Sequence, residues 1–153
     1  MAVRRIVYSN EPMLHEPSRR VRRVDADLEN LVEDMIETMH AANGIGLAAV
    51  QVGVPERVII VEVPVVQEDE AEPSEESLGT ELYVLINPEI VDASEESIEA
   101  IEGCLSIPGW AGEVDRRAEV TIEATDREGR PVRIEAEGLL ARVFQHEVDH
   151  CDG

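Results

Sequence analysis

The stretch GLLARVFQHEVDH, residues 138–150, decides how the rest of this chain is arranged, because it carries two histidines four residues apart in a largely apolar run. On a helix, His146 and His150 lie one turn apart on the same face, where two imidazoles can bind one metal ion. Glu147 then lies beside them in the position of a general base. The stretch therefore predicts a C-terminal helix that forms half of a catalytic metal site.

Two histidines leave such a site incomplete, because a catalytic ion usually has three protein ligands and a water. Zinc peptidases with this motif take their third ligand from further along the chain. Only three residues follow His150, so we expect the ligand from upstream and exclude the usual metalloprotease layouts. Cys104 is the natural candidate, since its surroundings, EGCLSIPG at 102–109, show no helical period and can present a thiolate from a loop or strand edge. A lone cysteine is otherwise a small buried residue, but the HExxH motif in the same chain favours the ligand.

The composition limits the classes of partner. The 153 residues suit a single domain, 1–153, and the 34 acidic residues outnumber 13 basic ones, all arginine, for a net charge of -21. Such a surface repels phosphates and anionic membranes, so we expect neither direct nucleic-acid binding nor membrane binding. The acidity fits either adaptation to high salt or a compositional habit of the source genome, and both interpretations stay open.

Targeting signals are also informative. No apolar stretch follows the early arginines as in a secretory signal, and the longest apolar run, 58–66, is broken by Glu62 and Pro64. Only two cysteines are present, Cys104 and Cys151, so a structural disulfide is the weaker interpretation. We expect a cytoplasmic protein.

Hydrophobic spacing predicts the main elements. An amphipathic helix is expected over 25–42, capped by Asp25 or Asp27 and ending at Asn43-Gly44. Buried strands are expected at 58–63 and 82–86, the second ending at an Asn87-Pro88 turn. The helix positions are Leu28, Leu31, Val32, Met35, Ile36 and Met39.

Two further segments complete the predicted fold. Residues 119–124 and 131–136 alternate apolar and polar residues around a turn, which predicts a hairpin leading directly into the final helix. Its inner faces carry Val120, Ile122, Val132 and Ile134. The segment 67–80 is rich in Glu, Asp, Ser and Pro and predicts an acidic loop. Because long strand-helix-strand crossovers are missing, the fold class is α+β: short antiparallel sheets packed around a C-terminal metal-binding helix, with one N-terminal amphipathic helix.

The stretch GIGLAAVQVG, residues 44–53, has two glycines that superficially suggest a phosphate-binding turn. It follows a helix and lacks both a third glycine and a lysine, which argues against a nucleotide site. We interpret it as backbone kept bare at Gly44 and Gly46 so that a ligand can lie close, with the Gln51 amide able to donate.

Together, GIGLAAVQ at 44–51, EGCLS at 102–106 and QHEVDH at 145–150 resemble, in order and spacing, the three signature motifs of the peptide deformylases. The resemblance spans nearly the whole chain. It implies a metal-dependent hydrolase that removes the N-formyl group from the N-terminal formyl-methionine of nascent polypeptides and releases formate. It also implies N-formyl-methionyl peptides as partners.

The resemblance further implies the site residues. Its metal ligands fall on Cys104, His146 and His150, and they hold one divalent ion, Fe(II) in the family, replaceable by zinc, nickel or cobalt. Glu147 takes the proton of the attacking water, while the Gln51 amide and the backbone N–H of Leu105 stabilise the formyl oxygen. The substrate-binding positions are Gly44, Ile45, Gly46, Glu102, Leu139 and Val143.

The same resemblance gives Glu102 an arginine partner, for which Arg116 is the best candidate. Asp149 either orients a ligand imidazole or lies on a solvated helix face, and we favour the solvated face. The chain departs from the family at Ala111, where relatives often carry arginine, and at Cys151, where they carry leucine. Cys151 is either a small core residue or a competing thiol.

Relatives continue past the position of Gly153 with a tail that docks on the ribosome in some members. The resemblance therefore keeps the ribosome among the candidate partners, although the usual docking tail is absent from this sequence. We also expect a monomer. The alternatives to an active deformylase are an inactive metal-binding relative and a hydrolase of another small N-formyl or N-acyl substrate.

Overall fold

The computed structural model describes residues 3–8, 11–64 and 80–153. The elements, in chain order, are a 3-10 helix η1 (Pro12–His15), α1 (Ala26–Ala41), β1 (Gly46–Ala48), a second 3-10 helix η2 (Ala49–Val52), β2 (Val58–Pro64), β3 (Thr80–Ala93), β4 (Ser97–Cys104), β5 (Ile107–Arg117), β6 (Glu119–Thr125), β7 (Pro131–Glu137) and α2 (Gly138–Asp152). The acidic loop predicted over 67–80 falls outside the described residues except for Thr80, where β3 begins. None of the described helices is long and apolar enough to cross a membrane.

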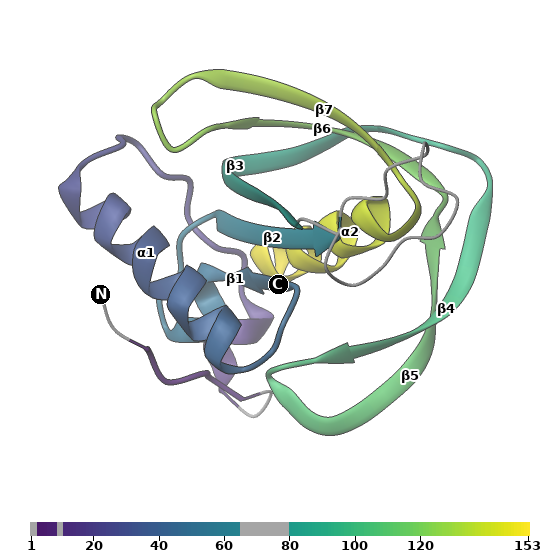
Figure 1. The fold of residues 1–153 in the computed structure, drawn as a ribbon, viewed down its shortest axis with the longest axis horizontal. Coiled ribbons are helices and arrows are strands. Elements are labelled where there is room, and N and C mark those ends of the chain that lie inside the picture. The colour runs from purple at the N-terminus through teal and green to yellow at the C-terminus, as the bar shows by residue number, and fades with distance from the viewer. Residues whose placement is uncertain (1–2, 9–10, 65–79) are drawn as a thin grey trace.

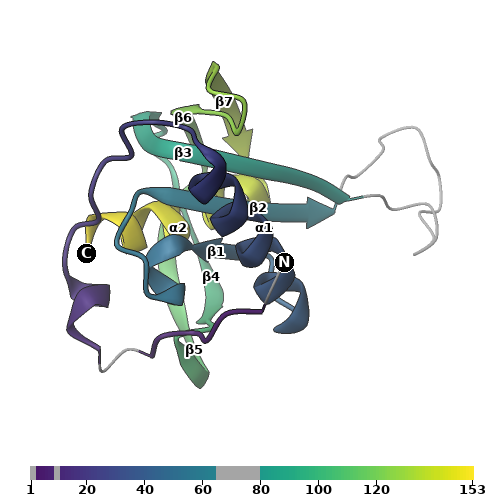
Figure 2. The same cartoon turned by 90° about the vertical axis from the view of Figure 1, so that its left-hand side faces the viewer.

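The strands form two separate antiparallel sheets, as Figure 1 shows. Within residues 3–8, 11–64 and 80–153, one sheet has five strands in the order β1-β2-β3-β6-β7, and the other consists of β4 and β5. Both predicted helices and the predicted antiparallel sheets are present, so the α+β class is confirmed. Figure 2 shows β2 and β3 extending together to one side of the molecule.

The core lies on both faces of the five-stranded sheet, because the side chains of β2 alternate between two helices. Val58 and Ile60 belong to the apolar cluster that contains Met35 and the rest of the buried face of α1. Their neighbours Ile59 and Val61 belong to the cluster that contains Phe144 of α2. The sheet is therefore a central layer between α1 and α2.

Helix α1 agrees with its prediction to within a residue or so at each end. Asp25 is the cap, since its side chain accepts a hydrogen bond of 2.9 Å from the backbone N–H of Leu28. At the other end Asn43 adopts a left-handed conformation with φ of 56°, and the N–H of Gly44 donates to the carbonyl of Met39. A short turn thus connects the end of α1 to the start of β1.

The predicted hairpin is also confirmed. β6 pairs with β7 in a register that places Ile122 opposite Ile134 and Val120 opposite Ala136. The turn is held by Asp126, whose side chain accepts hydrogen bonds from the N–H groups of Glu128 and Arg130, both at 2.9 Å. β7 then leads without a loop into α2.

The prediction that the second strand ends at Asn87-Pro88 is wrong. β3 continues to Ala93, and the pair forms an irregularity at which the register with β6 shifts between Ile86 and Glu89. Asn87 has φ of 53°, and its side-chain amide exchanges hydrogen bonds of 2.7 and 2.9 Å with the backbone of Val21. The proline, which has no N–H, and the asparagine mark a bulge in a long strand instead of its end.

The sequence did not predict the β4–β5 sheet. Both strands were missed because their described side chains are mostly exposed and give no apolar alternation. The expectation that a loop or strand edge carries Cys104 is met, since Cys104 is the last residue of β4.

Candidate active site

Helix α2 presents three different faces, and each has its own partner. The apolar face consists of Ala141, Phe144, Val148 and Cys151, which are buried against the five-stranded sheet. The polar face consists of Arg142, Gln145 and Asp149, which bind residues of β4 and β5. The third face carries Val143, His146, Glu147 and His150. Spacings of three and four residues produce this division, so one helix supports the core and holds the site.

The last turn of α2 is fastened to other parts of the chain. The carbonyl of Cys151 accepts hydrogen bonds from the backbone N–H of Ser18 at 2.7 Å and from Arg57 at 3.2 Å. Arg57 also pairs with Asp152 at 2.8 Å. These contacts satisfy the carbonyl of Cys151, which the helix itself leaves without a partner, and they fix the turn that carries His150.

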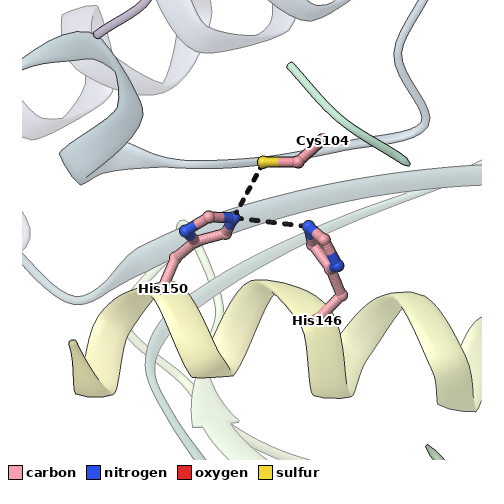
Figure 3. Close-up of side chains that lie close together, drawn as sticks. All are labelled: Cys104, His146 and His150. Atoms are coloured by element: carbon pink, nitrogen blue, oxygen red, sulfur yellow. Dashed lines mark hydrogen bonds between the residues drawn. The ribbon is translucent and has the colours of Figure 1, made fainter. Parts of the chain in front are cut away.

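The predicted metal ligands come together. Sγ of Cys104 lies 3.4 Å from Nε2 of His150, and that nitrogen lies 3.3 Å from Nε2 of His146. Figure 3 shows both imidazoles projecting from α2 toward the cysteine on the opposite segment. All three donor atoms lie within 4.8 Å of one another. A tetrahedral ion with metal–N of about 2.0–2.1 Å and metal–S of about 2.3 Å keeps its ligand atoms roughly 3.3–3.6 Å apart. The two separations that involve His150 match this range, so the donor set suits a divalent ion.

The protonation states suit this interpretation. Burial, together with the nearby His146 and Arg116, lowers the pKa of His150 to about 4, so its imidazole is neutral at pH 7. Burial raises the pKa of the Cys104 thiol, and the negative charge of Glu147 adds to the effect, although hydrogen bonds from Ser106 and Ile107 oppose it. Ion binding is therefore expected to displace the thiol proton.

Glu147 lies beside the ligands and is 4% exposed. Its Oε1 is 4.0 Å from Nε2 of His146, and its Oε2 is buried with no hydrogen-bond partner among the described residues. Burial raises the pKa of Glu147 to about 8, with Arg116 opposing and Glu102 reinforcing the shift. A buried carboxylate with an unsatisfied oxygen at a candidate metal site is suited to exchange a proton with a water or a substrate.

Glu102 orients His146, because it accepts a hydrogen bond of 2.9 Å from Nδ1 and thereby leaves Nε2 free to bind an ion. The predicted partner Arg116 binds the same carboxylate at 3.0 Å. Sequence reasoning missed a second arginine, Arg142, which binds it at 2.5 Å. Asp149 is largely exposed, in agreement with the favoured solvated face, and it also pairs with Arg116. Burial alone would raise the pKa of Glu102, but its hydrogen bonds to Arg116, His146 and Arg142 outweigh burial and lower it to about 2.

Gln51 is almost fully buried in η2 and is fixed at both ends of its amide. Its oxygen accepts a hydrogen bond of 2.9 Å from the N–H of Ala48, and its nitrogen donates to Oγ of Ser106 at 3.1 Å. The same nitrogen lies 3.6 Å from Sγ of Cys104. The amide nitrogen therefore lies beside the thiol of Cys104, and Ser106 is a contact that the sequence did not indicate.

The glycines before Gln51 also allow close packing within the chain. A Cβ on Gly46 would lie 2.9 Å from Cγ1 of Val143 and 3.0 Å from Oε1 of Glu147. A Cβ on Gly44 would lie 2.9 Å from Cδ1 of Leu105. Side chains of this chain lie beside both positions, so the bare glycines let Leu105 approach Gly44 and let β1 approach α2 closely.

A cleft of about 480 Å³ opens over these groups. The predicted substrate-binding residues Gly44, Ile45, Gly46, Glu102, Leu139 and Val143 all line it. Leu105, Ile101 and Arg142 line it as well, and the last two were not predicted. Ile45 and Leu139 remain 43% and 49% exposed, which leaves apolar surface on the cleft wall for a ligand.

A thiolate donor, two imidazoles and a buried carboxylate at a partly apolar cleft are typical of mononuclear metal-dependent hydrolases. The polypeptide deformylase family model matches residues 3–153. A peptide deformylase of Thermomicrobium roseum is 49% identical over 153 residues, which cover 100% of this chain and 83% of that protein. One of Roseiflexus castenholzii is 53% identical over 135 residues, 87% of this chain and 73% of that protein.

Solved structures agree. The crystal structure of peptide deformylase from Ehrlichia chaffeensis is similar with a TM-score of 0.87 and 43% identity, covering 99% of this chain and 84% of that chain. A second crystal structure of that protein, in complex with actinonin, matches equally well, with a TM-score of 0.87. The chain belongs to the peptide deformylase family. It is accordingly a hydrolase that removes the N-formyl group of nascent polypeptides, and the inactive relative and the hydrolase of another acyl group are not favoured.

Proposed function

We propose that deformylation takes place in the cleft described above, with Cys104, His146 and His150 holding one divalent ion and Glu147 transferring the proton. The observation that carries this proposal is the convergence of three donor atoms within 4.8 Å beside a buried carboxylate oxygen without a partner. When bound, the ion would supply Lewis acidity, which makes a water more acidic and offsets negative charge on the formyl oxygen.

The chain's own groups perform the remaining steps. Glu147 takes a proton from the water that attacks the formyl carbon and returns it to the leaving amine. Its raised pKa, about 8, suits a group that both accepts and donates a proton near neutral pH. The Gln51 amide nitrogen, held beside Cys104, and the backbone N–H of Leu105 donate to the formyl oxygen as it becomes charged.

The substrate is proposed to bind as an added strand. Among the described residues, β1 is an edge strand of the five-stranded sheet, and Gly44, Ile45 and Gly46 lie where β1 enters the cleft. An extended peptide can therefore pair with this edge while its methionine side chain packs on Ile45, Leu139 and Val143. An unbranched thioether suits such an apolar wall.

The proposed ion is Fe(II), with zinc, nickel and cobalt as replacements. One sulfur and two nitrogen donors suit several of these ions, and the family resemblance supports iron. We further propose that the enzyme acts in the cytoplasm as a monomer on N-formyl-methionyl peptides. The two free cysteines agree with a reducing compartment.

The ligand assignment is tested by metal content. Protein prepared anaerobically is expected to carry one iron per chain by elemental analysis. The separate variants Cys104→Ala, His146→Ala and His150→Ala should each lose it, whereas His40→Ala, on the exposed end of α1, should keep it. Full metal content in any of the three ligand variants would contradict the assignment.

A further inference from the structure

The candidate metal site spans a joint between two parts of the molecule. Cys104 belongs to the β4–β5 sheet, whereas His146 and His150 belong to α2, which packs on the five-stranded sheet. Among the described residues, no ladder of strand hydrogen bonds connects β4–β5 to the larger sheet. Whatever holds β4–β5 against α2 therefore sets the distance between the cysteine and the histidines.

Arg142 lies at the centre of this joint. Its Nη1 donates to the carbonyl of Val114 in β5 at 2.9 Å and to Oε2 of Glu102 in β4 at 2.5 Å. Its Nη2 donates to the carbonyl of Ile98, also in β4. One guanidinium from α2 thus binds both strands of the small sheet, and its side chain is only 12% exposed. A lysine has no planar fork and cannot hold the same three acceptors in this arrangement.

The carboxylate that Arg142 binds is the one that orients a metal ligand. Oε1 of Glu102 accepts a hydrogen bond from Nδ1 of His146 at 2.9 Å, while Oε2 is held by Arg142. A contiguous set of hydrogen bonds therefore leads from Arg142 through Glu102 to His146.

We propose that Arg142 is a positioning residue that holds β4–β5 against α2 and fixes Glu102, so that Cys104 and His146 meet the same ion. The family resemblance gives Glu102 one arginine partner, Arg116; Arg142 is a second, and it alone reaches the backbone of both strands. The inference rests on the ligand set of the proposed function. Arg142 itself acts through Glu102 and through the strands, not on the formyl group.

The test measures Co(II) binding by absorption, because the thiolate-to-cobalt band reports on the Cys104 bond directly. The variants are Arg142→Met, Arg142→Lys, Glu102→Gln and the double variant Arg142→Met/Glu102→Gln. Arg133→Met is the matched control, since Arg133 pairs with Glu123 on the exposed β6–β7 hairpin. Circular dichroism and thermal unfolding of the metal-free proteins check that each variant is folded.

Arg142→Met is expected to weaken Co(II) binding about 10- to 100-fold and to alter the thiolate band, with Arg142→Lys in between and Arg133→Met unchanged. Because Arg142 acts through Glu102, the fold-loss of Co(II) affinity in the double variant should be much smaller than the product of the fold-losses in the two single variants. Wild-type Co(II) affinity and an unchanged thiolate band in Arg142→Met would overturn the proposal. So would a double variant whose loss of Co(II) affinity equals the product of the two single losses. If Arg142→Met does not fold, Arg142→Lys and its double variant with Glu102→Gln decide by the same criteria. Wild-type protein that binds no Co(II) would overturn the ligand set itself, and this proposal with it.

Discussion

At the scale of single residues, the site depends on the close packing of the β1 backbone against α2 as much as on the chemical groups of its side chains. Gly46 in β1 lies against Val143 and Glu147 so closely that a methyl group would collide with both. The carboxylate of Glu147, which we propose transfers the proton, is therefore positioned by a neighbour that has no side chain. The role of Gly46 is steric: it leaves room for Glu147 beside the candidate metal ligands.

Gly46→Ala tests this packing. The added Cβ would lie 2.9 Å from Val143, so β1 or α2 must shift, and we expect a loss of about 1–3 kcal/mol in the free energy of unfolding. Urea unfolding of the metal-free protein measures the loss. The double variant Gly46→Ala/Val143→Ala removes one of the colliding groups and should recover part of the stability. Equal stability of Gly46→Ala and wild type would contradict the steric account.

Glu102 gives the molecule a defined acid sensitivity. Its pKa is about 2 in the folded protein against a usual value of 4.5, so the folded state favours the charged carboxylate. The stability that Glu102 contributes is complete above pH 4.5 and is lost as the pH falls from 4.5 toward 2. Glu102→Gln should therefore be less stable than wild type at pH 7, and the difference should shrink as the pH falls through this range. Denaturant unfolding of the metal-free proteins at several pH values measures this difference in stability. A difference that stays constant with pH would contradict the lowered pKa of Glu102.

At the scale of elements, α2 both packs in the core and carries the candidate site, because its three faces contact different parts of the molecule. Its apolar face contains Phe144, fully buried and in edge contact with Tyr83 at a centroid distance of 5.4 Å. Leu139, at the start of the helix, is 49% exposed on the wall of the cleft. Substitutions on the two faces should therefore affect different properties.

Phe144→Ala should lower the free energy of unfolding by about 3–5 kcal/mol, because it leaves a cavity between α2 and the sheet. Leu139→Ala, in contrast, should change stability little and raise KM for formyl-methionyl peptides, since it removes apolar surface from the proposed methionine wall. Calorimetry and steady-state kinetics measure the two effects. A destabilised Leu139→Ala with unchanged KM would contradict this division of the helix.

The elements also show how far sequence reasoning reaches. α1, the β6–β7 hairpin and α2 follow from local patterns: apolar spacing, a capping aspartate and a turn. β4 and β5 were missed because their exposed side chains carry no such pattern, and they are positioned by distant partners on α2. The three sequence motifs were sufficient to group Cys104 with His146 and His150. The second arginine on Glu102 and the serine beside Gln51 could be identified only from the folded structure, because the motifs do not show which side chains these residues contact.

At the scale of the whole molecule, the net charge of -21 is expected to make the stability depend on salt. Most carboxylates lie on the surface and repel one another, and chloride salt screens this repulsion as the Debye length falls from about 10 Å at 0.1 M to about 3 Å at 1 M. We expect the thermal midpoint of the metal-free protein to rise between 0.1 and 1 M NaCl, with sucrose as an uncharged control for solvent effects. A midpoint that falls with salt would show that the ion pairs, such as those of Glu102 and Arg57, outweigh the repulsion.

The central claim, that Glu147 transfers the proton at a metal site built from β4 and α2, is tested most directly by formate release from formyl-Met-Ala-Ser. Wild type and Glu147→Gln are loaded anaerobically with Fe(II) and assayed in parallel, with metal content measured in the same samples. We predict turnover by wild type that disappears on chelation, and a loss of about 10²- to 10⁴-fold in kcat in Glu147→Gln at equal metal content. Turnover by Glu147→Gln at the wild-type rate, or wild-type turnover that survives chelation, would contradict the account.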